Sequence, residues 1–141
     1  MSTRRWIGEL ESWLRRSKLS KEELAEHAAH NEAHVLDLFE QPDPNPTLQL
    51  YLDLVDAAGA RFHGVAANEP RAVIERLKEI MTREKVLTVS ALAKVAGVNR
   101  SQLSSLLNDD DPNPALLTFH RLVVALGAEQ DFVLVSKMDQ V

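Results

Sequence analysis

The chain has 141 residues, a formal net charge of −5 and no cysteine. The negative charge argues against bulk, sequence-independent binding to nucleic acid, and the lack of cysteine excludes a disulfide framework and a thiolate metal site. The chain begins without the apolar run of a signal peptide, and no apolar stretch approaches the roughly 20 residues that span a bilayer, so we expect a cytoplasmic protein with no membrane role.

The first half of the chain predicts four short helices. Its apolar residues recur at helical spacing, Ser20 and Glu23 form a capping-box pattern, and Gly59 is a typical helix end. Three prolines between residues 41 and 46 require a loop, and Asn45-Pro46 is typical of a helix start. The expected helices cover residues 3–17, 21–28, 31–40 and 46–58, and a short segment at 60–66 follows that could be extended.

The second half repeats this order. Helices are expected from Pro70, after the cap residues Thr88 and Asn99, and from Asn113-Pro114. Residues 131–136 are rich in β-branched and apolar side chains and predict a strand. Because a lone strand is not stable, it must pair either with residues 60–66 or with its own copy in a second chain.

The two halves are copies of each other. The motif Asp43-Pro44-Asn45-Pro46 recurs 68 residues later as Asp111-Pro112-Asn113-Pro114. Held at that offset without gaps, residues 19–65 and 87–133 share 17 identities in 47 positions. A register of this length is typical of an internal duplication. It predicts two small tandem domains, residues 1–66 and 67–141, related by an approximate two-fold or screw symmetry.

Residues 92–108 resemble a helix-turn-helix, with Gly97 as the small turn residue and Leu92 and Leu103 among the apolar anchors. With its flanking helices this segment resembles the Cro/C1-type (XRE) DNA-binding family. The extension from Asp111 to Gly127 and the strand after it resemble the HigA-type antidote proteins of addiction modules. The resemblance implies a mainly α fold of two tandem four-helix Cro/C1-type domains, each followed by a short strand.

The resemblance also implies which residues meet DNA. In this family the start of the second motif helix reaches base edges in the major groove, and arginine, glutamine and serine are suited to bases there. The first motif helix holds phosphates. Residues 66–108 carry seven basic and four acidic residues, net +3. The implied DNA-binding residues are Thr88, Ser90, Lys94, Asn99, Arg100, Ser101, Gln102 and Ser104.

Two features of the sequence depart from this pattern. Asp109-Asp110-Asp111 directly follows the recognition helix, where it would repel a DNA backbone. The first copy has Glu32, Ala33, His34 and Leu36 at the recognition positions, so we expect it to be an interaction module. Two hypotheses follow: a sequence-specific DNA-binding regulator, repressor or antitoxin-like, or a protein-interaction adaptor or antitoxin-like partner binder that kept the fold without DNA binding.

Other kinds of site have little support in the sequence. No nucleophile has an arranged base and no glycine-rich phosphate loop is present, so we expect neither an enzyme nor a cofactor. His27, His30 and His34 have near-helical spacing, but the helix breaks before Asn31, so we expect no metal site. The expected partners are double-stranded DNA, a second copy of the chain in a homodimer held by the C-terminal strand or the first copy, and a toxin or other protein.

Overall fold

The computed structural model describes residues 3–84 and 88–138 of the chain. Within these ranges the protein is mainly α-helical, with one small antiparallel sheet and one short 3-10 helix. No helix of the described ranges is both long and apolar enough to cross a membrane. The elements are α1 (Arg4–Ser17), α2 (Lys21–His27), α3 (Glu32–Glu40), α4 (Leu48–Ala57), β1 (Ala60–Phe62), α5 (Pro70–Glu84), α6 (Val89–Ala96), α7 (Arg100–Asn108), α8 (Leu116–Ala125), η1 (Glu129–Asp131) and β2 (Leu134–Ser136).

Side-chain caps determine where α2, α3, α6 and α7 begin. At α2 the Ser20 hydroxyl accepts a hydrogen bond from the Glu23 N–H at 3.1 Å, and the Glu23 carboxylate accepts one from the Ser20 N–H at 3.2 Å. Asn31 caps α3, Thr88 caps α6 and Asn99 caps α7 through their side-chain oxygens. Each cap satisfies a backbone donor that the helix itself leaves without a partner. The predicted starts of these four helices are confirmed.

The fourth helix of each half begins later than predicted. α4 starts at Leu48, with Thr47 as its cap, and α8 starts at Leu116. The prediction that Asn45-Pro46 and Asn113-Pro114 open these helices was therefore wrong. Each Asn-Pro pair lies in the loop before its helix, where it contacts the other half of the chain.

This loop contact is reciprocal. The Leu48 N–H donates to the Pro114 carbonyl at 2.8 Å, and the Leu116 N–H donates to the Pro46 carbonyl at 2.8 Å. Exchanging each residue for its counterpart 68 positions away converts the first bond into the second, because Leu48 corresponds to Leu116 and Pro114 to Pro46. The two halves therefore meet through the same surface on each, as the subunits of a two-fold symmetric dimer do.

The two strands also join the halves. β1 pairs with β2 so that Ala60 lies opposite Ser136 and Phe62 opposite Leu134. Of the two pairings that the sequence left open for the C-terminal strand, the structure shows the one within the chain. The predicted strand over residues 131–136 was too long. Asp131 is the last residue of η1, Phe132 is buried in the core, and β2 begins only at Leu134.

A shared hydrophobic core links the halves at Trp6 of α1, which is 1% exposed. Its indole N–H donates to Nδ1 of His120 in α8 at 2.6 Å, and its carbonyl accepts from the Tyr51 hydroxyl of α4 at 3.0 Å. The rings of Phe62 and Phe119 lie 5.5 and 5.8 Å from it, centroid to centroid. Trp6 is thus buried between the two halves of a single chain.

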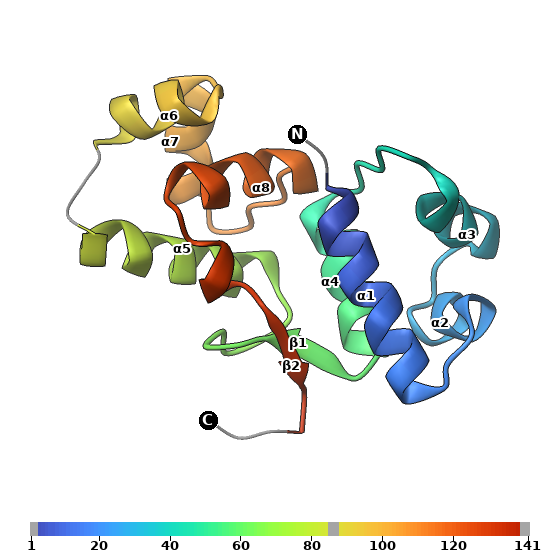
Figure 1. The fold of residues 1–141 in the computed structure, drawn as a ribbon. Helices are drawn as coiled ribbons and strands as arrows, with labels where there is room; N and C mark the ends of the chain where they lie inside the picture. The colour runs from blue at the N-terminus through green and yellow to red at the C-terminus, as the bar shows by residue number, and fades with distance from the viewer. Residues whose placement is uncertain (1–2, 85–87, 139–141) are drawn as a thin grey trace.

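The α2–α3 and α6–α7 pairs lie at opposite ends of the molecule, with α1, α4, α5 and α8 between them (Figure 1). Each pair packs on the last helix of its own half, α2 on α4 and α6 on α8. The outer surface of α6 and α7 is therefore far from the first half of the chain.

Candidate nucleic-acid interface

A tight turn and two side-chain caps fix the geometry of α6 and α7. Gly97 ends α6 with φ of +72°, a conformation that glycine adopts without steric cost. The Asn99 side-chain oxygen then accepts from the N–H groups of Ser101 and Gln102 at 2.8 and 3.3 Å. This cap makes Arg100 the first residue of α7. The sequence therefore specifies locally which residues stand at the start of this helix.

Three of the predicted base-contacting residues lie together. Arg100, Ser101 and Ser104 line one shallow surface hollow, with Val89 of α6 and Ser105 of α7. Val89 and Ser105 were not predicted. Ser105 lies four residues after Ser101, so helical periodicity alone could have placed it on the same face.

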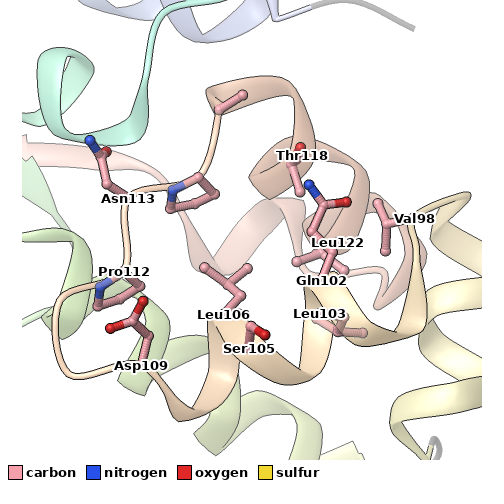
Figure 2. A pocket seen from close by; sticks show the side chains of 12 residues that line it. Val98, Gln102, Leu103, Ser105, Leu106, Asp109, Pro112, Asn113, Thr118 and Leu122 are labelled. Atoms are coloured by element: carbon pink, nitrogen blue, oxygen red, sulfur yellow. The ribbon is translucent and has the colours of Figure 1, made fainter.

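The fourth predicted base contact, Gln102, lies on a neighbouring face of α7. It lines a pocket of about 270 Å³ between α7, α8 and the loop that joins them. Figure 2 shows Gln102 and Leu106 of α7 in this pocket with Thr118 of α8 and Asn113 of the loop. Gln102 is nevertheless exposed, so its amide can reach a ligand on the outer surface.

The predicted phosphate contacts occupy the start and the middle of α6. The Thr88 hydroxyl accepts from the Ala91 N–H at 3.1 Å, so it serves first as a helix cap. Ser90 and Lys94 are exposed. Within the described residues neither Lys94 nor Arg100 forms a salt bridge, so both cations keep their full charge for an outside partner.

Other basic residues of this half are less available. The Arg83 guanidinium donates two hydrogen bonds to the Asp131 carboxylate, both at 3.2 Å, and Arg76 adds a third at 3.3 Å. The hydrogen bonds from Arg83 lower the pKa of Asp131, against the opposing effect of its partial burial. Lys85, one of the seven basic residues between positions 66 and 108, lies outside the described residues.

The acidic run after α7 is exposed at all three positions, Asp109, Asp110 and Asp111. The Asp109 carboxylate accepts from the Asp111 N–H at 3.0 Å, which holds the loop in a tight turn. Asp109 also lines the pocket that contains Gln102. The positive charge on α6 and α7 is therefore bounded on one side by carboxylates, which limits the width of any phosphate-binding surface.

The first copy presents a different surface at the equivalent place. Asn31 caps α3 by accepting from the His34 N–H at 3.2 Å, so α3 begins as α7 does. Glu32, Ala33 and His34 are exposed there, and Leu36 is half-buried. No cation of this face matches Arg100 or Lys94.

The histidines of the first copy are not gathered into one site. His30 lies 2.9 Å from the Asp53 carboxylate of α4. His27, but not His30, lines a polar groove that also contains Asp53 and Asp56. Across residues 3–84 and 88–138, no cluster of three or more His, Cys, Asp or Glu side chains could hold a metal ion.

The arrangement on α6 and α7 offers hydrogen-bond donors and positive charge on an exposed helical surface with only a shallow hollow. It suits a long polar ligand that lies across the surface better than a small molecule in a deep cleft. Comparison of the chain with protein-family models, with characterised proteins and with solved structures found no match.

Proposed function

We propose that the protein is a sequence-specific DNA-binding regulator, a repressor or antitoxin-like protein, that reads the major groove with α7. The observation that carries the proposal is the capped start of α7, which presents Arg100, Ser101 and Gln102 to solvent, while Lys94 is exposed on α6. A helix that meets the groove with its first turn places these side chains at base edges.

The side chains suit this role chemically. The guanidinium of Arg100 can donate two hydrogen bonds to guanine, the amide of Gln102 can pair with adenine, and the hydroxyl of Ser101 can bond to either base. Lys94 and the hydroxyl of Ser90 can hold phosphate oxygens and so set the register of the helix on the duplex. Among residues 3–84 and 88–138, neither Arg100 nor Lys94 forms a salt bridge, so neither side chain has to break an internal ion pair to bind DNA, which supports this role.

The proposal includes the arrangement of the two halves. Helices α1–α4 and α5–α8 would each form a Cro/C1-type helix-turn-helix unit, followed by the strands β1 and β2. Equivalent caps at Asn31 and Asn99 and the 68-residue offset support this assignment. The homodimer expected from the sequence stays a prediction, and since β2 pairs with β1, its interface would have to use another surface.

A protein-interaction role is the second candidate. The exposed carboxylates at Asp109–Asp111, directly after α7, and the acidic surface of α2 and α3 favour a protein partner, such as a toxin, over a phosphate backbone. On this alternative the fold persists without DNA binding.

One experiment separates the two candidate functions. The purified full chain selects bound duplexes from a random pool at low and at moderate salt. A DNA-binding regulator returns a recurring motif whose enrichment is lost when Arg100 is replaced by alanine. Arg15→Ala is the matched control, because Arg15 is an exposed arginine of α1 that lines a hollow with residues at the start of α2, in the first half of the chain. Recovery of no motif at either salt concentration would reject DNA reading and favour the protein-interaction role.

A further inference from the structure

The structure joins two equivalent units in one chain, yet their outer helix pairs differ in charge. We propose that a single chain binds an asymmetric duplex site, in which sequence-specific contacts are confined to the half-site under α7. This inference rests on the proposed function and adds the architecture of the DNA site and the number of chains that occupy it.

The reciprocal loop contact fixes the two units relative to each other. The Leu48 to Pro114 bond and the Leu116 to Pro46 bond are the same bond seen from each half. The β1–β2 pair and the core around Trp6 add two further connections. The chain therefore already contains the two-unit arrangement that helix-turn-helix proteins usually reach by dimerisation.

The turns before α3 and α7 show that these helices are equivalent. In the second half Gly97 N–H donates to the Lys94 carbonyl and Val98 N–H to the Ala93 carbonyl. In the first half Ala29 N–H donates to the Glu26 carbonyl and His30 N–H to the Ala25 carbonyl, which is the same pattern 68 residues earlier. The residues on the outer faces of the two helix pairs can therefore be compared position by position.

The first unit has carboxylates at three positions where the second unit has its proposed DNA-binding groups. Glu22 stands in the place of Ser90, Glu26 in the place of Lys94, and Glu32 in the place of Arg100. All three glutamates are exposed, and none forms a salt bridge within the described residues. A surface of this kind releases no counterions from DNA and repels phosphates.

The consequence is a DNA site without two-fold symmetry. A symmetric dimer reads a palindrome because both of its recognition helices carry the same side chains. Here only α7 can read bases, so the half-site that α3 would occupy adds no specificity. Recruitment of a second chain is not required to complete the two-unit arrangement.

The wild-type chain provides the first test. Duplexes selected from a random pool are expected to share one short motif without an inverted repeat. Native mass spectrometry of the selected duplex is expected to show one chain bound. A palindromic motif, or two chains on each duplex, would overturn the inference while leaving the proposed function intact. Failure to select any motif would remove the proposed function, and this inference with it.

A graft provides the second test. Glu26→Lys, Glu32→Arg, Ala33→Ser and His34→Gln together give the first unit the counterparts of Lys94, Arg100, Ser101 and Gln102, all at solvent-exposed positions. The grafted chain is expected to select an inverted repeat and to bind it at least about tenfold more tightly than the single motif, because two linked heads act together.

The control for the graft carries the same change in charge elsewhere. Glu69→Lys with Glu75→Arg also adds four positive charges, at exposed positions before and on α5. It is expected to strengthen binding to all duplexes alike without creating an inverted repeat. If the graft folds, as thermal unfolding by circular dichroism reports, and still selects the single motif, the inference is overturned. If it does not fold, the stoichiometry and motif of the wild-type chain decide.

Discussion

Asn45 and Asn113 hold the two halves of the molecule together by the same hydrogen bond made in opposite directions. The Asn45 side-chain oxygen accepts from the Leu117 N–H of α8 at 3.2 Å, and the Asn113 side-chain oxygen accepts from the Gln49 N–H of α4 at 3.0 Å. Each asparagine thus caps the helix of the other half. The repeated Asp-Pro-Asn-Pro motif is the surface through which the two halves meet.

Loss of either cap should therefore weaken the whole fold. We expect Asn45→Ala and Asn113→Ala each to lower the free energy of unfolding by about 0.5–2 kcal/mol, the usual cost of losing an asparagine cap. Urea unfolding followed by circular dichroism measures this. Asn108→Ala is the matched control, because among the residues that the structure describes the Asn108 side chain bonds only to Ser104 of its own helix. If Asn45→Ala and Asn113→Ala have the same free energy of unfolding as Asn108→Ala, the two caps do not stabilise the contact between the halves.

The turn before α3 contains a residue in an unfavourable conformation. Ala29 has φ of +57°, whereas its counterpart Gly97 has φ of +72°. The left-handed conformation destabilises a residue with a Cβ by about 1–2 kcal/mol. Glycine removes this strain, but its greater conformational entropy in the unfolded chain offsets part of the gain. We expect Ala29→Gly to stabilise the protein by about 0.5–1 kcal/mol.

The opposite exchange is the control for this prediction. A Cβ at Gly97 would meet no atom within 4 Å, so Gly97→Ala adds backbone strain without a steric clash. It should destabilise the protein by about 1 kcal/mol. Thermal unfolding of both variants checks the pair, and a destabilising Ala29→Gly would show that the two turns are not equivalent.

His120 should make the stability depend on pH. Burial, and next the positive charge of Arg5, lower the pKa of His120 from its ordinary value of 6.5. Above pH 6.5 the imidazole is neutral in both the folded and the unfolded chain. Below pH 6.5 the unfolded chain binds a proton that the folded chain does not, so stability falls until the pH reaches the folded pKa.

The replacement His120→Gln separates this effect from other titrations. Glutamine keeps an acceptor for the Trp6 indole N–H, which now donates to Nδ1 of His120 at 2.6 Å, but it does not titrate. We expect the difference in unfolding free energy between wild type and variant to shift in favour of the variant as the pH falls below 6.5. A difference that stays constant from pH 7.5 to pH 5 would contradict the linkage.

Local signals accounted for most of the helices. Ser20, Asn31, Thr88 and Asn99 each bond to a backbone N–H two or three residues away, so the sequence alone specifies these helix starts. Asn45 was misassigned because its partner lies 72 residues away. A side chain that caps a distant helix resembles, in sequence, one that caps its own.

The position of the predicted site residues at the start of α7 followed from the sequence, but their grouping on the surface did not. The cap at Asn99 made Arg100 the first residue of α7, as the sequence suggested. Which side of α7 faces the start of α6 depends on how the two helices pack, so the hollow that joins Arg100 to Val89 and Ser105 was not foreseen. The same packing turns Gln102 toward α8.

Lys94 should contribute to affinity without contributing to specificity. It is exposed on α6 and free of salt bridges among the described residues, as a phosphate contact requires. We expect Lys94→Ala to weaken binding to all duplexes by a similar factor and to reduce the slope of log affinity against log salt by about 1. Titrations at several salt concentrations measure this. An effect limited to one sequence would instead assign Lys94 to a base.

The DNA affinity of the Arg100→Ala variant tests the reading of bases by α7 most directly. Fluorescence anisotropy measures this affinity on the selected duplex and on duplexes in which each base pair of the motif is changed in turn. We expect a loss of about 1–3 kcal/mol on the selected duplex and loss of discrimination at one G·C pair, with Arg15→Ala unchanged. Wild-type affinity and specificity in Arg100→Ala, together with altered specificity in Glu32→Ala, would contradict it and assign DNA reading to the first half of the chain.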